Sequence, residues 1–347
     1  MDNLEFAAIE SRGAPTPDEF AQLRLAAKPV IFRGLVTDWP AVKRGKIGAA
    51  ELFDYLRLMD SGKMQNTLLA APELAGRLNY NADYSGQNYS EQAETVGVAL
   101  DRLLTYENNS SAPAAFIQSL PLNDYMPEFA RAHPMTLPPA ETPPRAWIGN
   151  QTTVQTHFDV SENMACVVAG RRRFTLFAPD QLPNLYIGPL ESAPGRTPVS
   201  TVDLDNPDFE AHPHFRRALD NGYQAGLDAG DAIYIPMGWF HHVRALSPVN
   251  MLVNYWWSAP GAQLKQPWAA LLHAVMAFRN LPDADRQVWQ GLFSHFAFLD
   301  NGEPMSHLPQ DRRGFLGGVP DMHRGSQIYE ILAALGPEIG LDPPPRK

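Results

Sequence analysis

Three residues of the types that bind transition metals stand in two separate segments of the sequence. His157 and Asp159 are separated by one residue, and His241 follows much later, in the segment GDAIYIPMGWFHHV. Side chains two positions apart on a strand point to the same face, so His157 and Asp159 can reach one ion. Two histidines and one carboxylate on one face of an octahedral ion leave three positions open for a co-substrate and oxygen, as at non-haem Fe(II) centres. These residues therefore predict a site for iron and O2 chemistry.

The region that carries the three residues has a sequence pattern typical of antiparallel β structure. Between Arg145 and Ser258, short β-branched and aromatic runs are separated by Gly, Pro, Asp and Asn. The runs are Ala146 to Ile148, Met164 to Val168, Phe174 to Phe177, Ala232 to Ile235 and Met251 to Trp257. This pattern predicts a barrel or jelly roll in which the metal ligands lie on strands.

The flanking regions have a different periodicity, with apolar residues at three- and four-residue intervals. Before the β region we expect helices at Thr16 to Lys28, Gly48 to Met59 and Ala93 to Tyr106, with a strand at Pro29 to Gly34. After it we expect two aromatic-rich helices, Trp268 to Phe278 and Val288 to Phe298, and a third near Ser326 to Leu335. The chain therefore divides into a lead-in (1–130), a β core (131–260) and a helical region (261–347).

Composition excludes several classes of partner. The 38 acidic and 28 basic residues give a formal charge of -10, which disfavours phosphate backbones and anionic membranes. The single cysteine, Cys166, cannot form an intrachain disulfide, and we see neither a secretory signal nor an apolar stretch of about 20 residues. We therefore expect a cytoplasmic protein that binds no nucleic acid and no membrane.

With these motifs the sequence resembles the cupin-like JmjC oxygenases, especially the group around the asparaginyl hydroxylase that inhibits hypoxia-inducible factor. The resemblance is close from Trp147 to Ser258 and loose from Pro29 to Pro40. It implies a mainly β, double-stranded β-helix (jelly-roll) core with an N-terminal α/β lead-in and a C-terminal helical extension. It also implies Fe(II), with 2-oxoglutarate and O2 as co-substrates. The implied metal ligands, which are also the catalytic residues, are His157, Asp159 and His241.

The same resemblance implies a cation that pairs with the distal carboxylate of 2-oxoglutarate. In the run Arg171 to Leu176, strand alternation puts Arg172 on the face of Phe174 and Leu176 and the other two arginines opposite. Arg172 stands where the asparaginyl hydroxylase has a lysine, and a guanidinium can form a bidentate pair with a carboxylate. The alternative is that all three arginines line a solvated hairpin edge.

Further polar positions match the pocket of the family near the chelating end of the co-substrate. Asn163 and Asn254 are the matching amides, although each could instead be a purely structural amide. Where the family often has a tyrosine, this sequence has Phe116. The missing hydroxyl is replaced by Thr153, Thr156 or Tyr234, or else the co-substrate is held differently. His242, next to His241, is expected to be a packed or hydrogen-bonded neighbour.

The resemblance implies hydroxylation of an amino-acid side chain in a protein or peptide, while fold alone does not name the substrate, which could also be a small molecule. Two alternatives remain: a lysyl demethylase with the same iron chemistry, and a cupin that binds a metal or small ligand without turnover. The helices after the core carry more large apolar side chains than one buried face needs, which predicts a homodimer. The alternative is that these helices wrap the barrel.

Overall fold

The structure is a computed structural model that describes residues 6–109, 111–190, 198–258 and 267–313. The chain divides into two units, Met1–Gln263 and Leu264–Lys347. The second unit contains α8 (Pro267–Phe278), α9 (Asp283–Phe296) and the short η4 (Gln310–Arg312), so two of the predicted C-terminal helices are confirmed. The third, near Ser326 to Leu335, lies outside the described residues. None of the helices described is long and apolar enough to cross a lipid bilayer.

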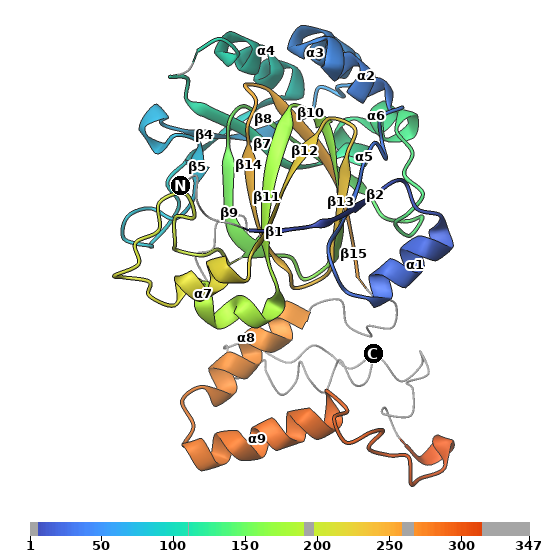
Figure 1. Cartoon of the computed structure of the whole chain (residues 1–347), viewed down its shortest axis with the longest axis vertical. Helices are drawn as coiled ribbons and strands as arrows, with labels where there is room; N and C mark the ends of the chain where they lie inside the picture. Colours follow the sequence, from blue (N-terminus) through green and yellow to red (C-terminus); the bar gives the residue numbers. More distant parts are fainter. Residues whose placement is uncertain (1–5, 110, 191–197, 259–266, 314–347) are drawn as a thin grey trace, which may run out of the picture. The chain divides into compact units, whose positions relative to one another are not determined.

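Two sheets form the first unit (Figure 1). The smaller sheet has the order β1 (Ala7–Ala8), β12 (Tyr223–Asp228), β11 (Arg171–Phe177), β14 (Phe240–Ala245), β9 (Thr153–Phe158) and β5 (Arg77–Leu78). The larger has the order β2 (Glu10–Arg12), β3 (Val30–Phe32), β13 (Ala232–Ile235), β10 (Glu162–Ala169), β15 (Asn250–Trp257), β8 (Pro144–Gly149), β7 (Ala114–Pro121), β4 (Met64–Ala70) and β6 (Ser90–Thr95).

The chain crosses between the sheets in the pattern of a double-stranded β-helix. From β8 to β15 successive strands alternate between the larger and the smaller sheet, except that β11 and β12 both lie in the smaller one, as antiparallel neighbours. All pairings among these eight strands are antiparallel. The mainly β jelly roll that the sequence predicts is therefore confirmed.

Strand alternation explains why β10 is apolar along nearly its whole length. Ala165 and Val167 point into the core between the sheets, where they meet Phe174 and Leu176 of β11. Met164 and its alternating partners Cys166 and Val168 point to the opposite face, into a second core. Because both faces of the larger sheet are covered, its strands need apolar residues at successive positions.

Helices cover the outer faces of the sheets. On the larger sheet lie α1 (Pro17–Leu25), α2 (Pro40–Ile47), α3 (Ala49–Arg57), α4 (Val96–Tyr106), α5 (Leu122–Tyr125) and α6 (Pro127–Ala132). Of these, α2, α3 and α4 lie next to one another at the top of Figure 1. On the smaller sheet lie α7 (Phe215–Asp220) and the 3-10 turn η2 (Pro179–Asn184), while η1 (Pro72–Leu74) connects β4 to β5.

The lead-in contributes strands as well as helices. Strands β2 and β3 extend one side of the larger sheet, and β4, β6 and β7 extend the other. The helix expected from Ala93 begins only at Val96, so that expectation was wrong for its first turn. Thr95 is the reason, because its hydroxyl accepts the Val98 N–H and caps the helix, while the residues before it pair with β4. The boundary at residue 130 stays a prediction.

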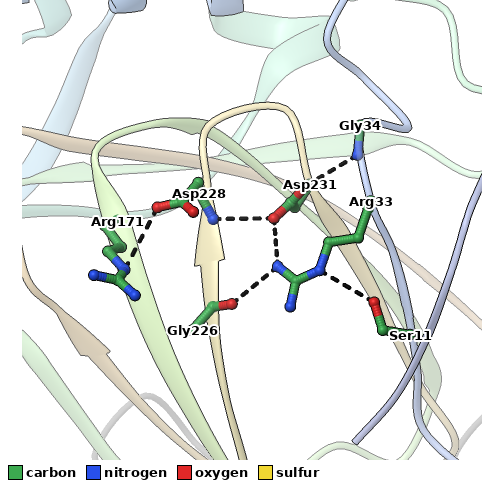
Figure 2. Close-up of polar contacts among 7 residues, drawn as sticks. All are labelled: Ser11, Arg33, Gly34, Arg171, Gly226, Asp228 and Asp231. Carbon is green, nitrogen blue, oxygen red and sulfur yellow. Dashed lines mark hydrogen bonds and ion pairs between the residues drawn. The ribbon is translucent and has the colours of Figure 1, made fainter.

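A buried carboxylate joins the lead-in to the β-helix at the turn between β12 and β13. Figure 2 shows Asp231 accepting hydrogen bonds from Arg33 Nη1 (2.6 Å) and from the Gly34 N–H (2.9 Å). It also accepts the Asp228 N–H at 3.2 Å, which closes the turn. The Asp228 side chain itself is exposed and faces Arg171 at 3.4 Å. One carboxylate therefore fixes β3 against the turn between β12 and β13.

We expect Asp231→Ala to lower the free energy of unfolding by about 2 to 3 kcal/mol, because the variant removes the acceptor of two backbone N–H groups and of the Arg33 guanidinium. Asp228→Ala removes only an exposed ion pair and should cost less than about 0.5 kcal/mol. Urea unfolding of both variants measures the difference. Equal losses would show that Asp231 does not carry the connection.

Candidate metal centre

Three ligand atoms converge where β9 and β14 pair. His157 on β9 lies directly opposite His241 on β14, and their ring centroids are 4.2 Å apart. Asp159 directly follows β9, and its Oδ2 lies 3.6 Å from His241 Nε2. The ligand atoms of all three side chains lie within 4.8 Å of one another. The structure thus brings together the three residues singled out by their types and spacing.

Each histidine ring is oriented by a backbone carbonyl two residues earlier in the chain. His157 Nδ1 lies 2.7 Å from the Gln155 oxygen, and His241 Nδ1 lies 3.2 Å from the Trp239 oxygen. A carbonyl can only accept, so Nδ1 carries the proton in both rings and Nε2 keeps a free lone pair. Burial, and then the neighbouring His157, lower the pKa of His241 to about 4. At neutral pH this ring is therefore an uncharged metal ligand, and the donor set fits a divalent iron.

His242, the residue next to His241, lies outside this cluster. It stands opposite Thr175 of β11, and the charged groups that affect it are Asp205, Arg173 and Arg244. Burial is the main reason that its pKa falls to about 3. Its Nδ1 has no hydrogen-bond partner among the residues described. Alternation along β14 thus directs the two histidines to opposite faces of the sheet.

The Asp159 carboxylate is held by side chains of the larger sheet. Its Oδ2 accepts from the Trp256 indole N–H at 2.9 Å and from Asn163 Nδ2 at 3.3 Å. Asn163 Oδ1 accepts from Asn254 Nδ2 at 3.2 Å, and Asn254 Oδ1 accepts from the Trp147 indole N–H at 2.7 Å. The structure therefore brings Asn163 and Asn254 to the centre, where they bond to each other.

The three consecutive arginines of β11 have different environments. Arg172 is 3% exposed on the face of Phe174 and Leu176, whereas Arg171 pairs with Asp228 and Arg173 with Asp205. The Arg172 Nη2 donates to the Trp147 oxygen at 3.3 Å, and its Nε has no partner among the described residues. Burial lowers the pKa of Arg172 to about 10, so the group remains a cation at neutral pH.

A buried cation of this kind needs an anion. The ion pairs found within the described part of the chain give Arg172 no carboxylate. The orphaned Nε and the missing counter-ion fit the distal carboxylate of a dicarboxylic co-substrate. The solvated hairpin edge, the alternative for this run, does not describe Arg172.

The hydroxyl groups considered as substitutes for a tyrosine lie in different places. Tyr234 donates to Glu162 at 2.6 Å, and its ring packs in the core on the helix-covered face of the larger sheet. It therefore does not supply the missing hydroxyl. Thr156 is buried beside His157, and its Oγ1 has no partner among the residues described. Phe116 packs against the Trp147 ring with centroids 5.9 Å apart.

Two contacts at the centre were not predicted from sequence, the indole N–H groups of Trp147 and Trp256. Trp256 shares a face with Asn254, two positions away on β15, and that alternation was a usable signal.

A double-stranded β-helix with two histidines and one carboxylate at one end defines a metal-binding cupin. The cupin-like domain family matches residues 16–263, and the chain belongs to this family. A relative named for the Jumonji C domain matches 72% of this chain. This match and the family confirm the resemblance to JmjC-type cupins and, for the family, the cofactors Fe(II), 2-oxoglutarate and O2.

Three relatives illustrate the range of names. Lysine-specific demethylase JMJ31 of Arabidopsis thaliana is 36% identical over 104 residues, 30% of this chain and 18% of that protein. The tRNA wybutosine-synthesizing protein 5 of Gallus gallus is 38% identical over 102 residues, 29% of each chain. Jumonji C domain-containing protein 5 of Drosophila melanogaster is 25% identical over 258 residues, 72% of this chain and 59% of that protein. The chain spans less than two thirds of each of these relatives.

Proposed function

We propose that the protein is an Fe(II)- and 2-oxoglutarate-dependent oxygenase that hydroxylates an amino-acid side chain of a protein or peptide. The observation that carries this proposal is the combination of an oriented ligand set, His157, Asp159 and His241, with Arg172, a buried cation that lacks a counter-ion. The first suits iron, and the second suits a dicarboxylate. A cupin that only binds a metal has no need for the buried cation.

Each residue has a separate task in this function. His157 and His241 would hold the ion through Nε2, since their Nδ1 protons are engaged by carbonyl oxygens. Arg172 would pair with the distal carboxylate of 2-oxoglutarate. When bound, iron supplies the oxidising chemistry: 2-oxoglutarate and O2 yield succinate and carbon dioxide, and one oxygen atom is added to the substrate. The apolar core between the sheets keeps water from the inner end of this site.

Lysyl demethylation is the second candidate, supported by the names of JMJ31 and of lysine-specific demethylase 8 of Danio rerio, which is 27% identical over 241 residues. The two reactions differ in their products, because removal of an oxidised methyl group releases formaldehyde and hydroxylation does not. A name that refers to tRNA raises a third kind of substrate. We propose that nucleic acid is not the partner, on the support of the net charge of -10.

The experiment that tests the proposal incubates the protein with Fe(II), 2-oxoglutarate, O2 and a peptide library. Succinate above the level of His241→Ala, together with peptides that gain one oxygen, is the expected result. Formaldehyde release would support demethylation instead. Stoichiometric Fe(II) binding without succinate formation would favour a cupin that does not turn over.

We also propose a homodimer built on α8 and α9 of a cytoplasmic protein. The two helices pack on each other through Phe278, whose ring stacks on Trp289 with centroids 4.6 Å apart and also contacts Phe293. Large apolar side chains remain more than one third exposed on α9 and just after it: Val288, Trp289, Leu292, Phe293, Phe296 and Phe298. A second copy would cover such a face. For the cytoplasm, the support is the single cysteine.

We expect the intact chain to have the mass of a dimer in light scattering at micromolar concentration. Changing Phe293 and Phe296 to Asp should give a monomer, because two charges cannot be buried in an apolar interface. Leu25→Asp, at an exposed site in the first unit, is the matched control and should leave the mass unchanged. A monomeric wild type would rule out the dimer.

A further inference from the structure

We propose that Trp147, Asn254, Asn163 and Trp256 are positioning residues that hold the Asp159 carboxylate ready for the metal, and that Trp147 sets the direction of their hydrogen bonds. This inference rests on the proposed function, because it assigns a task toward the same ion. It replaces the expectation that the two amides contact 2-oxoglutarate with a task that does not need the co-substrate.

The direction of the chain follows from the chemistry of its first member. An indole N–H can only donate, so Asn254 must turn its Oδ1 toward Trp147. Its Nδ2 then faces Asn163, which must accept through Oδ1 and in turn presents Nδ2 to Asp159. Each amide therefore has one orientation only. The Trp147 N–H at one end of these hydrogen bonds is thus compatible with an Asn163 N–H that donates to the Asp159 carboxylate at the other end.

Strand register places the four side chains in line. Asn163 on β10 stands opposite Trp256 on β15, and Asn254 lies two residues before Trp256 on the same face. Trp147 on β8 stands opposite Leu252 of β15, and its ring meets the Trp256 ring edge to face with centroids 5.7 Å apart. The hydrogen bonds from Trp147 through Asn254 to Asn163 therefore cross three adjacent strands, β8, β15 and β10. Asn163 and Trp256 then both donate to Asp159.

Burial makes the arrangement costly to change. Asn163 is 5% exposed and Asn254 is 2% exposed, so neither amide can exchange its partner for water. Each already uses its oxygen and one N–H within the chain. Two donors on Oδ2 restrict rotation of the Asp159 carboxylate, which otherwise sits on a single bond after the end of β9.

Loss of the Trp147 indole N–H should therefore lower the affinity for the metal. In Trp147→Phe an aromatic ring stays but the N–H is absent, so both amides can turn over and Asn163 can present its oxygen to the carboxylate. Repulsion between Asn163 Oδ1 and Asp159 Oδ2 would then turn the ligand away. Removal of an outer hydrogen-bond partner of a metal ligand typically costs ten- to a hundredfold in metal affinity.

The test measures Co(II) binding to the full chain by calorimetry and by visible absorption without 2-oxoglutarate, and then 2-oxoglutarate binding to the Co(II)-loaded protein. Trp147→Phe and Trp256→Phe should each weaken binding by about tenfold and change the absorption band of the bound ion. Trp257→Phe is the matched control on the opposite face of β15, where it packs on Tyr234, and it should bind like the wild type. If Trp147→Phe does not fold, Trp256→Phe still tests whether the donors to the Asp159 carboxylate position it for the metal.

The outcomes separate the inference from the proposed function. If wild type binds no Co(II), the metal centre itself fails. If wild type binds and both tryptophan variants bind equally well with the same spectrum, the positioning chain is overturned. The chain is also overturned if these variants lose affinity only for 2-oxoglutarate, because the amides would then be co-substrate ligands.

Discussion

His241→Ala should bind no stoichiometric Fe(II), whereas His242→Ala should keep most of the binding of the wild type. The reason is the opposite direction of two adjacent side chains on β14. His241 Nε2 lies 3.6 Å from Asp159 Oδ2 and belongs to the three-residue cluster, while His242 faces Thr175 and the Asp205 region. With His241 removed, two ligands remain, and they cannot complete the three-ligand face that holds the ion.

Anaerobic titration with Fe(II), followed by metal analysis of the protein after gel filtration, measures this difference. His242→Ala is a matched control because it removes the same ring from the next position of the same strand. Both histidines are buried, so the metal-free melting temperature of each variant shows that loss of binding is not loss of fold. An indispensable His242 would mean that the register of β14 against β9 is wrong.

Much of this centre could be predicted because strand alternation and motif spacing are local properties. Two-residue periodicity was enough to place Arg172 with Phe174 and Leu176 and to separate it from Arg171 and Arg173. The apolar runs from Ala146 to Trp257 identified five of the eight strands of the β-helix, β8, β10, β11, β13 and β15, since short runs bounded by turn residues have few other structures available.

Alternation fails where the ladder is irregular. Between β14 and β9 the register shifts, so that two steps from His241 to Val243 match three steps from His157 to Val154. The extra residue lets both His157 and Val154 face the core between the sheets, although a regular strand would turn them to opposite faces. No count of positions along the sequence reveals such a shift, because it depends on the pairing of two distant strands.

Apart from β3, which the strand expected at Pro29 to Gly34 matches, the strands of the lead-in were missed for a related reason. Strand β6 consists of SEQAET, which is polar and exposed at its first four residues, and it forms only because β4 offers it an edge. The hydrogen-bond chain from Trp147 to Asp159 is similarly non-local, since it needs the register of β8, β10 and β15 together. Contacts that depend on the pairing of several strands cannot be predicted from any one segment of the sequence, because they form only once the whole sheet is assembled.

Arg172→Ala should weaken 2-oxoglutarate binding by roughly ten- to a hundredfold, which corresponds to about 1.5 to 3 kcal/mol for a charge-assisted hydrogen-bonded pair. Two features make the loss large. The guanidinium is 3% exposed, so water cannot replace it, and its pKa of about 10 keeps it charged at neutral pH. Its Nε also has no partner in the described part of the chain, which leaves donors available for a carboxylate.

The measurement is calorimetric titration of 2-oxoglutarate into the Co(II)-loaded wild type and variants, with Arg173→Ala as the matched control. Arg173 is the next residue, but it faces the other side of the sheet and pairs with Asp205 at 2.8 Å, so its removal should leave affinity unchanged. Arg172→Lys keeps the charge and loses the bidentate geometry, and we expect an intermediate affinity. Equal affinities for Arg172→Ala and Arg173→Ala would refute the assignment. Succinate, which lacks the keto group that binds the metal, should lose affinity in Arg172→Ala as well, because the guanidinium contacts only the carboxylate far from the metal.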